Sequence, residues 1–405
     1  MNNKYKGFSL PLVLVIVTIT SIVSALTTGI IVYNNNKLSA KVAYTDLAKD
    51  EELNQFLKVY ANIISEYYED IDKEELLEKA IAAMMNYLGD DYTTYLDNTD
   101  TNDLVTQLSG EYKGIGIAIN NSTKIITEVF EDTPAEAAGI MSGDVIITVD
   151  GVNVENLTAS EIVKIIKDKK NDFALELKRG DEIIKVNLKN KSIISPSIDY
   201  KIIENTKTGY LHIETFSNTL EEQIRKALNK METAGMESLI IDLRNNTGGY
   251  LEAANKVTSI FTEKGKRIYS LEYKNEITHF NDETDEKRDY EIIILINKNT
   301  ASASEVMATA LRDSYGAKII GETSFGKGKV QQTMKLEDGS MVKYTSAYWL
   351  TPKGICIDQK GIIPDYSVNN EEIKDEDGNT IEIIDTQLEK AISIIAKNSD
   401  INNVE

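Results

Sequence analysis

Two short apolar runs, each followed by a segment of helical pattern, constrain the fold of this chain most strongly. Leu239–Leu243 is apolar at all but one position, and Ile292–Ile296 is apolar throughout. Helical patterns follow them at Leu251–Phe261 and Ala301–Ser314, and a third short strand is expected at Lys318–Ile320. Because strands without a polar face must be buried on both sides, the pattern predicts an α/β sheet that is covered on both faces.

The composition indicates a globular protein of several domains. The chain has 405 residues, of which 41% are hydrophobic and 27% are charged. Its formal net charge of −21 argues against a nucleic-acid partner, because phosphate binding needs a basic surface. The single cysteine, Cys356, excludes an intrachain disulfide, and its isoleucine neighbours predict a small core residue. The sequence has no CxxC, HExxH or clustered His/Asp set, so no metal site is expected.

A long uncharged run near the N-terminus predicts one transmembrane helix. Residues 8–33 carry no charged side chain and exceed the roughly 20 residues that a bilayer requires. Two lysines precede the run and two follow it, so the charge bias is weak. The short head (1–7) and large tail favour a single-pass protein of the cell membrane with an extracytoplasmic body. A cleaved signal peptide with a poor site at Val23-Ser24-Ala25 is the alternative, but the apolar run continues past it.

Changes in pattern divide the remaining chain into four parts. Residues 34–95 are expected to be helical, because apolar side chains recur at helical spacing between Leu53 and Leu88. The apolar stripe that they form is expected to pack as a core or as a dimer contact. Short strands and turns then predict a self-contained α+β domain at 110–193. Alternating strands and helices place the α/β core at 194–370. An acidic segment with one helix at Thr386–Ala396 completes the chain at 371–405.

Serines at a helix start are candidate nucleophiles in a chain that is poor in histidine. His212 and His279 are the only histidines, so a lysine is the base to consider for a serine hydrolase. Ser302 falls in the first turn of a helix that follows a buried strand, where the helix dipole favours developing negative charge. A plain helix cap is the alternative use of a serine at this place.

Lys327 is the candidate base, since Gly326 and Gly328 let the backbone turn tightly around it. A free lysine has a pKa of about 10.4, and lowering it by about 3 requires about 4 kcal/mol against the charged form. Burial with few counter-charges has that effect. A solvated lysine on a flexible loop is the alternative, and Lys329 is a competing base. Gln331 is placed to hold the lysine by a hydrogen bond.

A glycine-rich turn follows the first apolar strand and is a candidate oxyanion hole. In Asp242–Gly249, the pair Gly248 and Gly249 exposes backbone N–H groups that suit a developing oxyanion. Phosphate cradling is a rival use, but no GxxxxGK[ST] motif is present. An ordinary turn between a strand and a helix is the remaining alternative.

Taken together, these segments resemble the C-terminal processing, or tail-specific, proteases. The resemblance covers residues 50–395, and its motifs are specific as a set. It includes a region similar to the PDZ domain of that family. The matching segments are Thr300–Glu305, Gly321–Gln331, Asp242–Gly249, Gly114–Ile117 with Thr133–Ile140, Leu350–Gly354 and Lys360–Asp365.

The resemblance implies a core of the crotonase/ClpP-like α/β type with an inserted PDZ domain. It implies that Ser302 is the nucleophile, Lys327 the general base and Gln331 the residue that positions the lysine. The backbone N–H of Ala303 and of the turn Gly248-Gly249 match the oxyanion hole.

Three positions bear on how far the resemblance extends. Ser304, the alternative nucleophile, aligns with a non-catalytic position. Lys329 stands where the family usually has a small polar residue, and a second ammonium is expected to lower the pKa of Lys327 further. Asp90–Tyr95 replaces a more usual Asp-Pro-Tyr pattern and is expected to affect a hinge.

The function that follows is a membrane-anchored serine endopeptidase without a metal or organic cofactor. Its PDZ loop, Gly114-Ile115-Gly116-Ile117, presents N–H groups to a terminal carboxylate, and the adjoining strand edge can accept a peptide as an extra strand. Expected substrates are loosely folded protein tails with apolar C-termini. The helices at Leu53–Leu88 and Thr386–Ala396 are candidate homodimer contacts. A catalytically inactive PDZ scaffold that binds C-termini is the alternative function.

Overall fold

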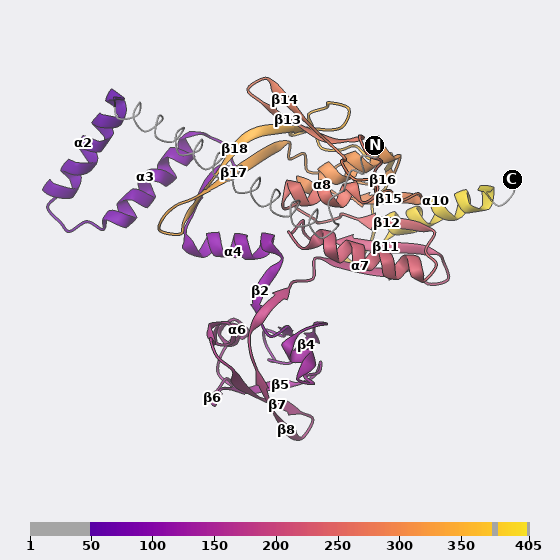
Figure 1. The fold of residues 1–405 in the computed structure, drawn as a ribbon, viewed down its shortest axis with the longest axis horizontal. Coiled ribbons are helices and arrows are strands. Elements are labelled where there is room, and N and C mark those ends of the chain that lie inside the picture. The colour runs from indigo at the N-terminus through magenta and orange to yellow at the C-terminus, as the bar shows by residue number, and fades with distance from the viewer. Residues whose placement is uncertain (1–48, 375–379, 403–405) are drawn as a thin grey trace, which may run out of the picture. The chain divides into compact units, whose positions relative to one another are not determined.

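The computed structural model describes residues 49–374 and 380–402 of the chain (Figure 1). The predicted head (1–7) and membrane anchor (8–33) lie outside the described residues, so both stay predictions. Within the described ranges, no helix is both long enough and apolar enough to cross a bilayer. The chain divides into two compact units after Ala83.

The N-terminal region forms two helices, α2 (Glu51–Glu66) and α3 (Lys73–Tyr87), as the helical spacing predicts. Neither helix has a buried residue. The apolar stripe of α2 is exposed, with Phe56 at 44% and Ile63 at 39%. The stripe therefore does not pack as a core among the described residues, and its use as a dimer contact stays a prediction.

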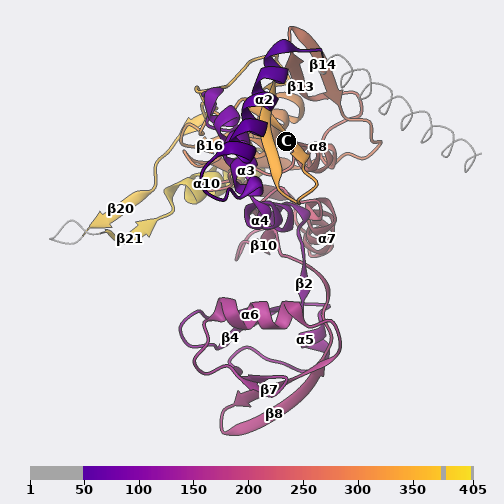
Figure 2. The same cartoon turned by 90° about the vertical axis from the view of Figure 1, so that its left-hand side faces the viewer.

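Residues 111–194 form a small domain with its own core (Figure 2). Ile126, Ile162 and Leu175 are fully buried in that core. The strands β2 and β9 pair at the domain's entry and exit, with Glu111 opposite Ile194. The elements are β2 (Glu111–Gly114), β3 (Ile117–Ile119), β4 (Ile126–Val129), α5 (Pro134–Ala137), β5 (Val145–Val149), β6 (Val152–Asn153), α6 (Ala159–Asp168), β7 (Phe173–Arg179), β8 (Glu182–Leu188) and β9 (Lys191–Ile194).

The larger core contains a six-stranded sheet in the order β10-β11-β12-β15-β16-β19. All neighbouring strands are parallel except β10, which runs antiparallel to β11. The strands are β10 (Ile198–Ile202), β11 (Thr208–Ile213), β12 (Ser238–Asp242), β15 (Glu291–Ile296), β16 (Lys318–Gly321) and β19 (Tyr366–Ser367).

Helices cover both faces of this sheet, which confirms the prediction from the apolar strands. Leu239 and Ile241 pack into the main core with residues of the helices that follow β11, β12 and β15. Ile240, which points to the other face, packs with Ala391 and Ile395. The helices are α7 (Leu220–Thr233), α8 (Leu251–Ser259), α9 (Ala303–Ala310) with a π-helical turn at Leu311–Tyr315, and α10 (Thr386–Asn402).

A second sheet, which is antiparallel, was not predicted from the sequence. Its order is β1-β18-β13-β14, and β17 pairs with the other edge of β18. The pairing of β1 with β18 brings the residues around position 94 onto the core. The strands are β1 (Thr94–Leu96), β13 (Arg267–Tyr273), β14 (Glu276–Asn281), β17 (Lys329–Lys335) and β18 (Met341–Leu350).

Two further elements complete the described chain. The helix α4 (Asn98–Ser109) begins at Asp97, whose carboxylate caps it, and leads into the small domain. The strands β20 (Glu371–Lys374) and β21 (Thr380–Ile384) form a separate hairpin (Figure 2). Cys356 is half-buried rather than a full core residue, because it lies in a loop beside the exposed Ile355.

Candidate active site

Ser302 lies at the start of α9, where the chain turns sharply out of the loop after β15. Its backbone has φ +58° and ψ −120°, a conformation that residues with a Cβ rarely adopt. The loop is fastened to the neighbouring strand, because the Thr300 hydroxyl donates to the Leu243 carbonyl at 2.8 Å. Ser302 is half-buried, whereas Ala301 and Ala303 on either side are buried. This strained turn resembles the turns that expose a nucleophilic serine.

Glu305 connects the serine turn to the lysine loop. One of its carboxylate oxygens, Oε2, accepts the backbone N–H of Ser302 at 2.8 Å and that of Lys327 at 2.9 Å. The other oxygen accepts the Ser324 hydroxyl at 2.5 Å and the Gly326 N–H at 2.8 Å. Burial raises the pKa of Glu305, and these four hydrogen bonds oppose that rise. The buried Glu305 carboxylate therefore binds both the turn that carries Ser302 and the loop that carries Lys327.

Glu305 is not among the site residues predicted from the sequence, although the sequence contains a signal for it. It stands three residues after Ser302, which is the spacing of a helix capping box. The donors from the lysine loop are about 20 positions later in the chain, and no local pattern predicts them.

The electrostatic surroundings of Lys327 favour its neutral form. Burial lowers the pKa of Lys327, and the nearby Lys343 ammonium lowers it further, against the opposing effect of Glu305 and Asp90. Its Nζ lies over the ring of Tyr92, 4.8 Å from the ring centroid. Among the described residues, no hydrogen bond joins Lys327 Nζ to Ser302 Oγ. Lys327 is thus half-buried against an aromatic ring, and its pKa is lowered.

The glycines that flank Lys327 are required by close packing. Gly326 has φ +87°, and a Cβ there would lie 2.6 Å from the backbone nitrogen of Gly361. At Gly328, a Cβ would lie 2.7 Å from the backbone nitrogen of Asp358. The Lys327 carbonyl accepts the indole N–H of Trp349 at 2.8 Å. The loop is therefore a fixed structure, unlike the flexible loop considered as an alternative.

The glycine turn after β12 lies against Ser302, but only one of its two N–H groups is available. A Cβ at Gly248 would be 2.9 Å from the Cβ of Ser302. The Gly248 N–H already donates to the Asn246 side chain at 2.8 Å, so it does not face an oxyanion in this structure. Within the described chain, the N–H groups of Gly249 and Ala303 have no recorded acceptor. The prediction that the Gly248 N–H faces the oxyanion is therefore wrong for this structure.

The competing residues have other partners. The Ser304 hydroxyl is buried and donates to the Asn246 carbonyl at 3.0 Å. The Lys329 ammonium lies 2.8 Å from Asp90 Oδ1, and that hydrogen bond raises its pKa. The like charge that lowers the pKa of Lys327 therefore comes from Lys343, and not from Lys329 as expected.

Among the described residues, no hydrogen bond joins Gln331 to Lys327. Its amide donates to the Thr345 hydroxyl on the neighbouring strand, at 3.4 Å. The positioning role that the resemblance implies for Gln331 stays a prediction.

The predicted peptide loop of the small domain joins two of its short strands. It runs from Gly114, the last residue of β2, to Ile117, the first of β3. The carbonyls of Ile115 and Gly116 accept hydrogen bonds from the segment around α5, which fixes the loop. Among the described residues, the N–H groups of Ile115 and Gly116 have no hydrogen-bond acceptor, and both residues are buried.

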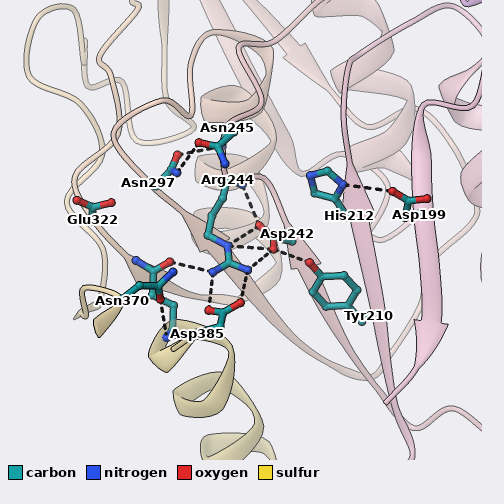
Figure 3. A pocket seen from close by; sticks show the side chains of 11 residues that line it. Asp199, Tyr210, His212, Asp242, Arg244, Asn245, Asn297, Glu322, Asn370 and Asp385 are labelled. Atoms are coloured by element: carbon teal, nitrogen blue, oxygen red, sulfur yellow. Dashed lines mark hydrogen bonds and ion pairs between the residues drawn. The ribbon is translucent and has the colours of Figure 1, made fainter. Parts of the chain in front are cut away.

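A polar hollow of about 410 Å³ is lined by the start of the Asp242–Gly249 turn (Figure 3). Arg244 fills its centre and pairs with Asp242 and with Asp385, which precedes α10. Tyr210 donates its hydroxyl to Asp242 at 2.7 Å. Neither Ser302 nor Lys327 lines this hollow, so Arg244 stabilises the turn and does not belong to the candidate site. No group of His, Cys, Asp or Glu among the described residues could hold a metal ion.

Comparison with known proteins supports the same combination of domains. The chain matches the models for peptidase family S41 at residues 207–368, for the PDZ domain at 103–178 and for the "activating protease CtpB N-terminal domain" at 23–100. A probable CtpA-like serine protease of Staphylococcus aureus (strain N315) is 36% identical over 361 residues, or 88% of this chain and 72% of the relative.

Two further proteins are similar over most of the chain. The carboxy-terminal processing protease CtpA of Bacillus subtilis (strain 168) is 36% identical over 354 residues, or 86% of this chain and 75% of the relative. The solved photosystem II D1 C-terminal processing protease is 25% identical, with a TM-score of 0.46, over 79% of this chain and 87% of that one.

Fold and domain content define a PDZ-containing serine protease. The chain belongs to peptidase family S41, the C-terminal processing peptidases. This agrees with the resemblance seen in the sequence motifs.

Proposed function

We propose that this protein is an endopeptidase that cleaves protein tails with Ser302 as nucleophile and Lys327 as general base. The observation that carries the proposal is the Glu305 carboxylate, one oxygen of which binds the backbone N–H groups of both residues. A base must also be neutral to accept a proton, and burial lowers the pKa of Lys327 in that direction.

The proposed reaction proceeds through an acyl-enzyme. Lys327 takes the hydroxyl proton of Ser302, and Oγ attacks the scissile carbonyl carbon. The tetrahedral oxyanion accepts hydrogen bonds from the N–H groups of Ala303 and Gly249. Collapse breaks the C–N bond, and Lys327 returns its proton to the leaving amine. Water, deprotonated by the same lysine, then hydrolyses the acyl-enzyme and restores both side chains.

The contacts favour this assignment over the competing pair. Ser304 is buried with its hydroxyl committed to a carbonyl, and Lys329 is held charged by Asp90. Gln331 is proposed to orient Lys327 once substrate fills the site.

The PDZ domain is proposed to bind the free carboxylate of a substrate tail through the N–H groups of Ile115 and Gly116. Apolar end residues suit this site, because Ile117, the first residue of β3, is half-buried and packs against the apolar core of the domain. We also propose that residues 8–33 anchor the protein in the cell membrane, with the body on the extracytoplasmic side, and that it forms a homodimer.

The test is cleavage of an unfolded fluorescent reporter with an apolar C-terminus by the purified full-length chain. Ser302→Ala and Lys327→Ala are each expected to reduce turnover by about 10³-fold or more. Lys264→Ala, which removes an exposed lysine on another surface loop, is the control and is expected to keep parental activity. Undiminished turnover in both site variants would defeat the dyad.

Tail recognition is tested with the same reporter ending in a carboxamide. Loss of the carboxylate is expected to raise KM, because the N–H groups of the PDZ loop then lose their acceptor. An inactive parent chain that still binds the free-acid tail, and not the amide, would instead favour the alternative, a PDZ scaffold without catalysis.

A further inference from the structure

Tyr92 contacts the proposed base although it lies far from it in the sequence. Its ring centroid is 4.8 Å from Lys327 Nζ and 5.7 Å from Lys329 Nζ. Both distances are within the range of about 6 Å in which an ammonium and an aromatic face attract each other. The phenol ring is therefore part of the wall around the Lys327 ammonium.

A set of hydrogen bonds, here called the Asp90 latch, holds the segment that carries Tyr92. The latch consists of Asp90, Thr93, Lys329 and Thr345. Asp90 Oδ1 lies 2.8 Å from Lys329 Nζ, and Oδ2 accepts the hydroxyls of Thr93 at 2.7 Å and Thr345 at 2.6 Å. The Thr345 N–H donates to the Thr93 hydroxyl at 3.1 Å.

The Asp90 carboxylate of the latch is ionised at neutral pH, because its pKa is lowered. Burial alone would raise the pKa of Asp90, but the hydrogen bonds from Lys329, Thr345 and Thr93 outweigh it and lower that pKa to about 2. Lys329 therefore has a structural function, because its ammonium binds Asp90 and holds the segment Asp90–Thr93 in place.

The ring has two opposing effects on Lys327. Its face attracts the charged ammonium, and this favours protonation. It also excludes water from that ammonium, and this favours the neutral form. Burial is the largest cause of the lowered pKa of Lys327, and the ring, with its centroid 4.8 Å from Nζ, contributes to that burial. The other groups that act on Lys327 are Lys343, Glu305 and Asp90.

We propose that Tyr92 is a positioning residue for Lys327, held over its ammonium by the Asp90 latch so that the lysine stays buried beside the nucleophile. The proposal rests on the Ser302–Lys327 dyad proposed above. It assigns the segment Asp90–Thr93 a place in the active site, whereas the sequence pattern indicated only a hinge.

The experiment compares kcat and KM across a pH series for the full-length parent, Tyr92→Phe and Tyr92→Ala. In Tyr92→Ala, water reaches the ammonium and the pKa of Lys327 rises. The midpoint of the acid limb is expected to move up by about one pH unit, so that kcat at neutral pH falls about tenfold and recovers at alkaline pH. Tyr92→Phe keeps the ring and is expected to keep the parental profile.

The latch is tested without any change of charge. Thr93→Val removes both hydrogen bonds of that hydroxyl and is expected to shift the midpoint in the same direction by a smaller amount. Thr94→Val is the matched control, because the Thr94 hydroxyl donates to the neighbouring Tyr95 carbonyl and, among the described residues, makes no hydrogen bond to Asp90 or Thr345; its profile is expected to be parental. If Tyr92→Ala does not fold, the comparison of these two variants decides.

Three outcomes would overturn the inference. The first is a Tyr92→Ala variant whose acid limb has the parental midpoint, and the second is a shift in Tyr92→Phe as large as that in Tyr92→Ala. The third is a loss of kcat in Tyr92→Ala that is equal at every pH. Lys327→Ala separates this failure from that of the dyad. If Lys327→Ala is inactive while Tyr92→Ala has the parental profile, only the role of Tyr92 is wrong. If Lys327→Ala stays active, the dyad itself fails.

Discussion

At the scale of single residues, two lysines only two positions apart have opposite electrostatic surroundings. Lys327 is half-buried and desolvation lowers its pKa, whereas Lys329 bonds to Asp90 and its pKa is raised. The pairing register of β17 with β18 shifts between Val330 and Gln331, where Ser346 is an extra residue in β18. Burial and partner, and not residue type, therefore decide which lysine can act as a base.

The charge of Lys343 provides a test of this balance. The Lys343 ammonium lowers the pKa of Lys327, so Lys343→Met removes a like charge and raises that pKa. Less of the base is then neutral at a given pH, and the acid limb of kcat is expected to move up by about half a pH unit. Lys343→Arg keeps the charge and serves as the control. A midpoint that moves down in Lys343→Met, or moves equally in both variants, would contradict this reading.

The sequence could predict some of the site residues and not others. Ser302 and Lys327 stand in local patterns, a helix start and a glycine-flanked loop, that chemistry makes recognisable. Glu305 and Tyr92 do not, because their roles depend on partners brought near only by the folded chain. The use of the Gly248 N–H was also beyond prediction, since it depends on the rotamer of Asn246.

At the scale of elements, the junction between β12 and α10 depends on Arg244. Its guanidinium is only 13% exposed and bonds to both Asp242 and Asp385. Asp385→Ala leaves Arg244 with one carboxylate and is expected to lower the free energy of unfolding by about 1–3 kcal/mol. Unfolding in urea measures this change in the free energy of unfolding. Asp285→Ala, which breaks the exposed pair with Lys264, is expected to change it by less than about 0.5 kcal/mol.

The elements that the sequence predicted best are those with a strong apolar pattern. β12 and β15 are buried on both faces and were predicted within one residue. The second sheet was missed because its strands lack such a pattern. All residues of β14 except Phe280 are exposed, and no residue of β17 is fully buried. Their pairing depends on long-range register, which local sequence does not specify.

At the scale of the whole molecule, the PDZ domain and the protease core have separate apolar cores. The cluster around Ile126 and Leu175 shares no residue with the cluster around Leu211 and Ile241. The two connections between the domains run side by side, since Glu111 pairs with Ile194 and the Gly110 carbonyl accepts the Ser195 N–H at 2.8 Å. The chain therefore enters and leaves the PDZ domain at one place.

This arrangement predicts that the PDZ domain can be removed without unfolding the core. Replacing residues 112–193 by a short Gly/Ser linker is expected to leave one cooperative thermal transition. The ends to be joined, Glu111 and Ile194, are already paired, and the deletion removes no residue of the protease core. The shortened chain is also expected to cleave free-acid and carboxamide reporters equally, since the groups that distinguish them are gone. A core that unfolds without cooperativity would show that the two domains stabilise each other. A shortened chain that still prefers the free acid would place recognition of the carboxylate outside the PDZ loop.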